Sequence, residues 1–195
     1  MASSTATQTG QSTWQLDAAH SSVEFSVKHM MMTTVRGRFK TVRATLTADE
    51  SHPAGCCVDA ELEVASLDTG SPERDAHLQG GDFFDAARFP TIRFVSKRVE
   101  GDVRQEGDRF KVIGDLSIRD TTMEITLDCT FEGRGKDPWG GERAGFSGSA
   151  EIDRREWGLR WNQMVETGGV LVANRVRLEL EVQFVRSEEP SGNPS

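Results

Sequence analysis

The sequence has no long apolar run and no excess of positive charge. No window approaches the roughly 18 apolar residues of a membrane-spanning helix, and the N-terminal MASSTATQTGQST lacks the basic and apolar regions of a secretory signal. Acidic residues outnumber basic ones by 31 to 23, and the net charge of -8 disfavours binding to nucleic acids and to anionic membranes. We therefore expect a cytoplasmic protein with no nucleic-acid partner and no integral membrane segment.

Cysteine pairs and catalytic motifs are also missing. The three cysteines are odd in number and two of them are adjacent, so the sequence predicts neither a disulfide framework nor a CxxC site. GxxxxGK[ST] and GxGxxG are absent, and GFSGS at 145–149 departs from the GxSxG nucleophile elbow. The sequence therefore indicates no nucleophile, no phosphate-binding loop and no cofactor.

Alternating polarity is what the sequence has in abundance. Apolar residues at 176, 178, 180, 182 and 184 alternate with Arg177, Glu179, Glu181 and Gln183, the pattern of a strand with one buried face. Such half-buried strands are typical of antiparallel sheets, since parallel sheets give continuous apolar runs between helices. We count eight strand-like runs, at 20–29, 35–48, 56–65, 91–99, 109–118, 122–131, 144–153 and 175–186.

Long, bent strands favour a closed barrel over a sandwich. The apolar phase of 35–48 slips midway, as expected where a strand turns a corner, and 110–131 is a long hairpin. SPERDAHLQ has a serine N-cap position followed by proline, which predicts a short helix at 72–79 that plugs or covers one mouth. The fold class is therefore all-β: an eight-stranded antiparallel lipocalin-like β-barrel with one short helix.

Both ends of the chain are polar. Residues 1–12 are rich in Ser, Thr and Gln, and 187–195 (SEEPSGNPS) contain two prolines, so neither end has an apolar period to bury. We predict disordered tails at 1–12 and 187–195 around a single barrel domain at 13–186.

Four stretches together resemble one known family. WQLDAAHSSVEFSVKH from Trp14, VRGRF at 35–39, ERDAHLQGGDFFDAARFPTIRFVS at 73–96 and IGDLSIRDTTMEITL at 113–127 are similar to the YceI-like family of polyisoprenoid-binding, lipocalin-like proteins. The similarity spans about 14–185. It implies an extended antiparallel barrel that holds a long isoprenoid or acyl-type chain, without an established catalytic activity.

For three of the histidines the sequence allows two roles, contact with a ligand or a structural hydrogen bond. His29 ends the inward row Val23, Phe25 and Val27, so it contacts either a ligand head group near the barrel mouth or a hydrogen-bond partner that closes the strand. The same alternatives hold for His20 and His77. A zinc site built from all three is disfavoured, because His20 and His29 have opposite phases along one strand.

We predict ligand contacts from the inward rows and from loops near the mouths. The run Met30 to Met32 lines a portal or fills an irregular barrel end, and Trp157, Trp161 and Met164 cover the opposite mouth or pack outside the sheet. The predicted ligand-binding residues are Phe25, Val27, His29, Met32, Val35, Phe39, Leu62, His77, Phe83, Phe94, Leu116, Met123, Ile125, Phe146, Trp157 and Met164.

The function predicted from these residues is binding of a long apolar ligand inside the barrel. A polyisoprenoid, an isoprenoid quinone or a fatty-acyl chain would be carried, stored or sequestered there, and its partner is a small molecule. Two alternatives stay open: an enzyme that acts on a lipid or quinone head group with His29 or His77 as base, and a filled barrel that serves as an interaction module. The sequence also leaves open a homodimer.

Overall fold

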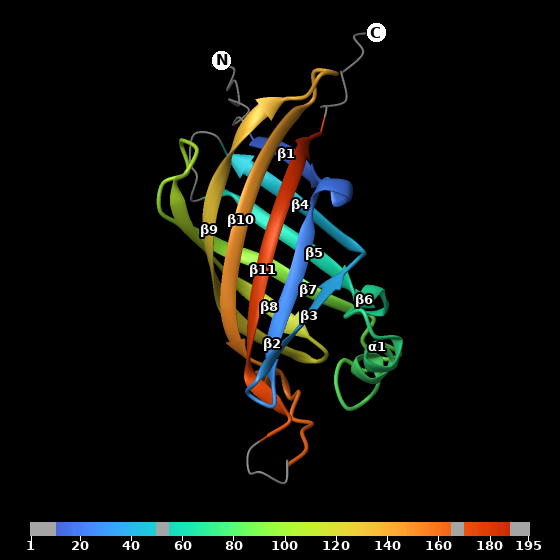
Figure 1. The fold of residues 1–195 in the computed structure, drawn as a ribbon. Coiled ribbons are helices and arrows are strands. Elements are labelled where there is room, and N and C mark those ends of the chain that lie inside the picture. Colours follow the sequence, from blue (N-terminus) through green and yellow to red (C-terminus); the bar gives the residue numbers. More distant parts are fainter. Residues whose placement is uncertain (1–10, 50–54, 165–169, 188–195) are drawn as a thin grey trace, which may run out of the picture.

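The strands form one antiparallel sheet that closes into a barrel (Figure 1). The computed structural model describes residues 11–49, 55–164 and 170–187. The ring runs β1, β4, β5, β7, β8, β9, β10, β11, and it closes because β1 pairs with both β4 and β11. The predicted eight-stranded antiparallel barrel is confirmed. The strands are β1 Gln11–Leu16, β2 Ser22–His29, β3 Thr33–Phe39, β4 Val42–Asp49, β5 Cys57–Glu63, β6 Leu67–Asp68, β7 Thr91–Glu100, β8 Arg109–Ile118, β9 Thr121–Lys136, β10 Glu142–Asp153 and β11 Val172–Arg186.

Strand β11 pairs with two strands from the N-terminal part of the chain. Its residues 184–186 pair with β1, and its residues 172–181 pair with β2. Strands β2, β3 and β6 continue the sheet at the lower end in Figure 1, where the β2–β3 turn lies, whereas β1 and β4 lie at the upper end, near the termini. The two ends of the barrel are therefore completed by different strands.

The prediction of one strand at 35–48 is wrong, because the structure has two strands there. The predicted inward faces on either side of the break are correct. Strand β3 ends at Phe39 and β4 begins at Val42, and the Lys40 amide donates to the Ser66 carbonyl oxygen at 3.1 Å in the corner between them. Phe39 and Ala44 are both buried, as the two apolar rows require. The expected bend is sharp enough to change the chain's partner from β2 to β1.

Strand β1 is missing from the prediction. It starts within the segment 1–12 that the composition predicts to be a tail, and its Trp14 is only 3% exposed. The Trp14 indole donates to the hydroxyl of Ser12, which is also buried. The barrel domain therefore begins at residue 11 instead of 13, and the remaining tail residues, 1–10 and 188–195, lie outside the described residues.

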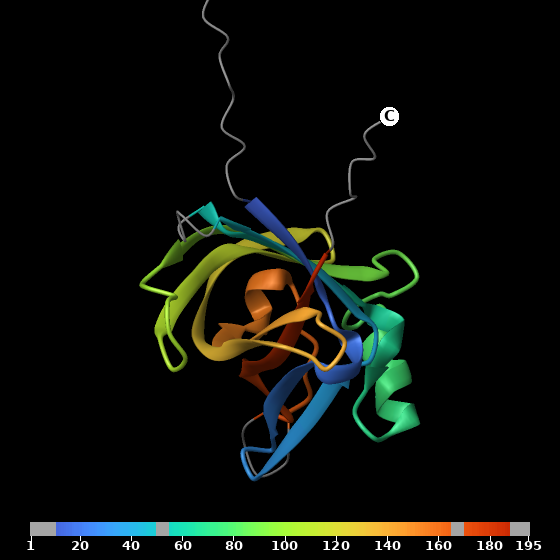
Figure 2. The ribbon, with the colours of Figure 1, turned by 90° about the horizontal axis from the view of Figure 1, so that it is seen from above.

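The helix is confirmed at its predicted bounds. Helix α1 spans Pro72–Gln79, with Pro72 in its first turn and Ser71 at the N-cap position. It lies beside β6 on the outside of the lower end (Figure 1), and the chain after it returns Phe83 and Phe84 to the barrel interior. Seen from above, the helix lies outside the ring of strands (Figure 2), so it does not plug the barrel, and the predicted covering of a mouth is not supported. The 3₁₀ turns of the described residues are η1 Ala18–His20, η3 Val64–Ser66 and η4 Arg154–Trp157.

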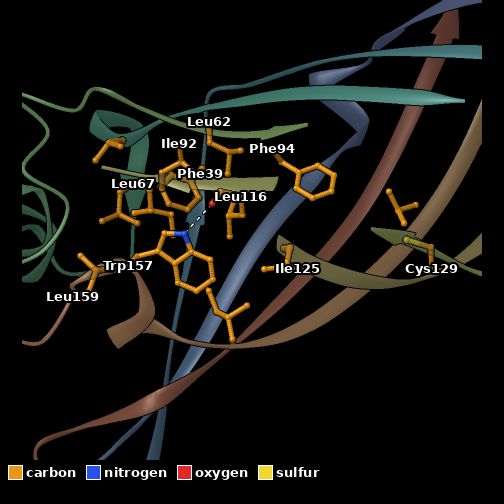
Figure 3. Close-up of a cluster of buried hydrophobic side chains, with 14 of the residues drawn as sticks. Phe39, Leu62, Leu67, Ile92, Phe94, Leu116, Ile125, Cys129, Trp157 and Leu159 are labelled. Atoms are coloured by element: carbon orange, nitrogen blue, oxygen red, sulfur yellow. Dashed lines mark hydrogen bonds between the residues drawn. The ribbon is translucent and has the colours of Figure 1, made fainter. Parts of the chain in front are cut away.

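A tryptophan at the centre of the lower end organises the larger apolar core. Turn η4 lies inside the ring when the barrel is seen from above (Figure 2), and its Trp157 is 1% exposed. The Trp157 Nε1–H donates to the Leu116 carbonyl oxygen at 2.9 Å, and the indole lies among Phe39, Leu159 and neighbouring side chains (Figure 3). The lower end is therefore packed and closed by side chains of the protein itself.

Candidate ligand-binding cavity

The inward apolar rows enclose a cavity of about 430 Å³. Its lining extends from Trp14 at the upper end to Leu159 at the lower end. Apolar residues and two cysteines make up the lining, apart from five charged residues, which are Glu24, Asp49, Arg134, Arg154 and Glu179. The volume lies within the range of small-molecule pockets in proteins. The interior is therefore hollow as well as apolar.

Two groups of phenylalanines form much of this lining. The Phe146 ring lies with its centroid 5.3 Å from Phe131, 6.1 Å from Phe110 and 6.2 Å from Phe184. Towards the lower end, the Phe39 ring lies 5.9 Å from Phe25 and 6.2 Å from Phe84. These tilted and edge-to-face contacts fix the rings to one another, so the cavity wall is preformed.

Two glycines make room for the curvature and for one of these rings. At Gly114, a Cβ atom would lie 2.5 Å from the Val95 carbonyl oxygen, beside the register shift that bends β7 against β8. At Gly37 the Phe25 ring occupies the space that a Cβ atom would need. Glycine is required at both positions for close approach, as is usual where strands bend or an aromatic ring crosses the backbone.

The model of the YceI-like domain family matches residues 14–184. The chain belongs to the YceI-like family. A UPF0312 protein of Staphylococcus aureus is 36% identical over 173 residues, which cover 88% of this chain and 96% of that protein. The crystal structure of BcnA from Burkholderia cenocepacia has a TM-score of 0.73 and 25% identity, and covers 86% of this chain and 98% of BcnA.

A third relative shares the fold at lower identity. The structure described as a polyisoprenoid binding domain from Saccharophagus degradans has a TM-score of 0.68 and 13% identity, with 89% of this chain and 98% of that chain covered. This likeness shows the fold alone. It places the YceI-like barrel of this protein among architectures whose members include a domain named for binding a polyisoprenoid.

Strand phase placed half of the predicted residues at the cavity, and Phe83, in the segment after α1, lines it as well. Period-two alternation sends every second side chain of a strand to the same face, so residues on regular strands can be placed from sequence. Nine of the predicted residues line the cavity in the structure: Phe25, Val27, Phe39, Leu62, Phe83, Phe94, Leu116, Ile125 and Phe146. Their contact with a ligand stays a prediction.

Seven predicted residues do not line the cavity, namely His29, Met32, Val35, His77, Met123, Trp157 and Met164. Trp157 is part of the packed core beneath it, and Met32 and Met164 are more than two-thirds exposed. Met123 has the inward phase of β9 and pairs with Leu116, which does line the cavity, but its own side chain is 37% exposed. His77 lies on helix α1 and Met164 precedes β11, so strand alternation says nothing about either of them.

The three histidines of the described residues lie outside the cavity lining, and two of them pair with a nearby aspartate. His20 Nδ1 lies 2.9 Å from Asp17 Oδ2, and His77 Nε2 lies 3.2 Å from Asp82 Oδ2. His77 also contacts the Trp161 ring edge-on, at a centroid distance of 4.6 Å. His29 makes no side-chain hydrogen bond within 11–49, 55–164 and 170–187, and those same ranges contain no group of three His, Cys, Asp or Glu that could hold a metal.

The two thiols of the cavity lining are poorly reactive. Burial raises the pKa of the Cys129 thiol to about 12, and burial also raises the pKa of Cys56. A thiol with a raised pKa is a poor nucleophile at neutral pH, because the thiolate is the reactive form. These two cysteines behave as small apolar parts of the wall.

Arg154 is the one fully buried cation of the lining among the described residues. Its guanidinium donates to four backbone carbonyl oxygens, those of Leu159, Trp161, Val172 and Ala173, at 2.6 to 3.4 Å. Burial lowers the pKa of Arg154, although a guanidinium stays protonated in proteins. The side chain ties the segment after η4 to the start of β11 and so fixes the lower boundary of the cavity.

Sequence reasoning missed several wall residues for different reasons. Leu180 and Phe184 line the cavity on β11, and their alternation with Glu179 and Glu181 was a sufficient signal. Trp14 belongs to the unpredicted strand β1. Ala60 belongs to the apolar row of 58–64 and its alternation gives the inward phase, but its small size leaves space in the wall that the sequence pattern does not show.

Proposed function

We propose that this YceI-like protein binds a long apolar molecule inside its barrel, of the polyisoprenoid, isoprenoid quinone or fatty-acyl type, and transports, stores or sequesters it. The observation that carries this proposal is the 430 Å³ cavity with its nearly continuous apolar wall. Such a wall offers a hydrocarbon chain burial without unpaired polar groups. It offers almost nothing to a polar metabolite, whose groups would lose their hydrogen bonds to water.

Hydrocarbon burial supplies enough free energy for useful affinity. Each buried CH₂ group contributes about 0.8 kcal/mol, so roughly ten of them reach the ~8 kcal/mol of a micromolar complex before the entropic cost of association is subtracted. A chain longer than a few isoprene units is therefore favoured over a short one. The domain of the same fold from Saccharophagus degradans, which is named for binding a polyisoprenoid, supports this ligand class.

Binding is a better account of the described lining than catalysis. The histidines that the sequence offered as the general base of an enzyme, His29 and His77, are not in the lining. The thiols that are there have raised pKa values. The hollow interior likewise gives no support to a barrel filled by its own side chains.

A cavity-filling variant tests the proposal without breaking the fold. Ala60 faces the cavity between Ala44 and Phe94 of the neighbouring strands, so Ala60→Phe places a ring where the ligand would lie. Glu61→Phe puts the same side chain on the outer face of the same strand and is the matched control. Native mass spectrometry should show a copurifying lipid of defined mass in the wild type and in Glu61→Phe, and none in Ala60→Phe.

A second readout uses delipidated protein. Adding an isoprenoid quinone or a long-chain fatty acid should raise the melting temperature of the wild type and Glu61→Phe, because a ligand that binds only the folded state stabilises it. Ala60→Phe should show no such rise while melting at or above the wild-type temperature. A wild type that carries no lipid and gains no stability from either ligand would rule out the proposed function.

A further inference from the structure

Arg154 brings a buried positive charge to the lower end of the cavity without a carboxylate beside it. The residue lines the cavity and is 4% exposed. Within 11–49, 55–164 and 170–187, no Asp or Glu side chain pairs with its guanidinium. The neighbouring Asp153 accepts hydrogen bonds of 2.6 to 3.2 Å from Arg155 instead. The carbonyl oxygens around Arg154 stabilise its charge but do not neutralise it.

One hydrogen of the Arg154 guanidinium has no acceptor in the described part of the chain. A guanidinium carries five N–H groups. The Nε–H donates to the Ala173 carbonyl oxygen, and one Nη2 hydrogen donates to that of Val172 at 3.4 Å. The two Nη1 hydrogens donate to Leu159 and Trp161. The second Nη2 hydrogen is therefore available, and the side chains of Leu159 and Val172 line the cavity next to it.

The arginine of the lining at the upper end is in a different state. The Arg134 side chain is 39% exposed and donates to the Glu142 carboxylate at 2.8 Å. Arg186 shares this carboxylate and is 42% exposed, and Asp49 also lines the cavity at this end. Water and salt screen exposed charges, and a carboxylate already lies between the two arginines. The attraction for an added anion is therefore weaker at the upper end than at Arg154.

The fold has already desolvated and positioned this cation before a ligand arrives. A carboxylate that moves from water into an apolar cavity loses its hydration, which is costly unless the group is paired. Arg154 has lost its own hydration on folding, and its contacts with backbone carbonyl oxygens hold the guanidinium in place. Binding therefore does not incur these two costs again. A neutral head group would accept the same hydrogen bond without the attraction between opposite charges.

We propose that Arg154 binds the carboxylate of a long-chain fatty acid at the lower end of the cavity, with the chain directed towards Trp14 at the upper end. This inference rests on the proposed function and narrows its ligand to one of the three types named there. A carboxylate carries a single negative charge, which matches the single guanidinium. The apolar rows between the two ends bury the hydrocarbon chain.

Three ligands with the same chain test the head group, namely palmitate, hexadecanol and hexadecyl phosphate. Their Kd values are measured by displacement of an apolar fluorescent probe from the delipidated full chain. Palmitate should bind at least about tenfold more tightly than hexadecanol, the factor expected for a hydrogen bond to a charged group. Hexadecyl phosphate should bind no more tightly than palmitate.

The same series distinguishes failure of this inference from failure of the proposed function. Equal affinities for palmitate and hexadecanol, or tighter binding of hexadecyl phosphate than of palmitate, would overturn the role of Arg154 and leave the apolar cavity as a binding site. No binding of any of the three, nor of an isoprenoid quinone, would overturn the proposed function and this inference with it.

Arg154→Gln and Arg155→Gln form a matched pair of variants. Both arginines belong to turn η4, and only Arg154 lines the cavity. The quantity compared is the ratio of the hexadecanol and palmitate Kd values, in which a loss of stability common to both ligands cancels. The two Kd values should become equal in Arg154→Gln, whereas Arg155→Gln should keep the wild-type ratio and Arg154→Lys should keep a preference for palmitate. An unchanged ratio in Arg154→Gln, or an equal fall in Arg155→Gln, would overturn the inference.

Fluorescence quenching locates the head group without altering Arg154. Trp157 lies beneath the cavity at the lower end, and Trp14 lines it at the upper end. A fatty acid brominated near its carboxylate should quench Trp157 more than Trp14, and one brominated near its methyl end should quench Trp14 more. The variants Trp14→Phe and Trp157→Phe assign the two signals. The reverse order of quenching would place the carboxylate at the upper end and overturn the inference.

Discussion

The two ends of the barrel are stabilised by different kinds of interaction. The lower end is built on Trp157, whose indole is buried, and on Arg154, whose guanidinium donates only to backbone carbonyl oxygens. At the upper end, Arg143 bridges the carboxylates of Asp17 and Asp137 at the surface. The lower end therefore depends on burial, and the upper end on ion pairs that solvent can screen.

Charge also surrounds the buried tryptophan of the upper end. The guanidinium groups of Arg134 and Arg186 lie 5.0 and 5.9 Å from the Trp14 ring centroid, and both donate to the Glu142 carboxylate at 2.8 Å. These two arginines lower the pKa of Glu142 to about 2. The two tryptophans thus have different environments, apolar around Trp157 and cationic around Trp14. Variants at each end should therefore differ in how much stability they lose and in how that loss depends on salt and pH.

Trp157→Ala should have the largest effect. Truncating a fully buried tryptophan leaves a cavity and should cost about 3–5 kcal/mol of unfolding free energy, measured by denaturant titration. Trp157→Phe keeps most of the volume but removes the donor to Leu116, and should cost about 1–3 kcal/mol. A Trp157→Ala variant as stable as the wild type would contradict the packed lower end.

Arg154→Leu should come next. The leucine fills part of the volume but leaves the carbonyl oxygens of Leu159, Trp161 and Ala173 without their donor, at a cost of about 1–3 kcal/mol for a buried unsatisfied group. The loss should be the same at low and high salt, because no carboxylate pairs with this guanidinium among the described residues. A stability loss that changed strongly with salt would contradict the conclusion that burial, and not ion pairing, stabilises the lower end.

Arg143→Gln should weaken the upper end in a pH-dependent way. Arg143 lowers the pKa values of Asp17 and Asp137, so the stabilisation is present above the ordinary carboxyl pKa and is lost as pH falls through the lowered folded-state values. The variant should melt a few degrees below the wild type at pH 7. Calorimetry at pH values falling below the ordinary carboxyl pKa should bring the two melting temperatures together, and a difference unchanged by pH would argue against the ion pairs.

Removal of the N-terminal residues should have the smallest effect. Deleting residues 1–10 should leave the unfolding free energy unchanged, because their sequence has no apolar period to bury. Deleting residues 1–12 also removes Ser12, the acceptor for the buried Trp14 indole, and should cost about 1–3 kcal/mol. Equal stability of the two truncated chains would show that the Trp14 hydrogen bond does not matter.

The sequence predicted the elements whose signals are local. Alternation placed the long strand β11, and the Ser71–Pro72 pair placed helix α1 at its observed bounds. Strand β1 was invisible because QSTWQL contains only Trp14 and Leu16 as apolar residues, too few to show a period. Its place in the ring follows from pairing with β4 and β11, which no local pattern encodes.

Which side chains face the barrel interior could be predicted from the sequence, but which of them line the cavity could not. Phe25 and Phe146 could be assigned to the interior, since each sits in an inward row. Inward phase alone does not bring a residue to the cavity, because Ile125 and Met123 share a phase on β9 and only Ile125 lines the cavity.

The partners of β11 have a consequence for how the protein is made. Strands β1 and β2 each have one edge that pairs with β11, which follows all the other described strands in the sequence. These two edges stay unpaired until β11 has been synthesised. Until then the inward phenylalanines form an open, curved sheet with its apolar face in water, and pairings this distant in sequence form slowly. The apolar face that lines the cavity is therefore accessible before the barrel closes, so an apolar molecule present during synthesis can be enclosed without passing through a mouth of the finished barrel.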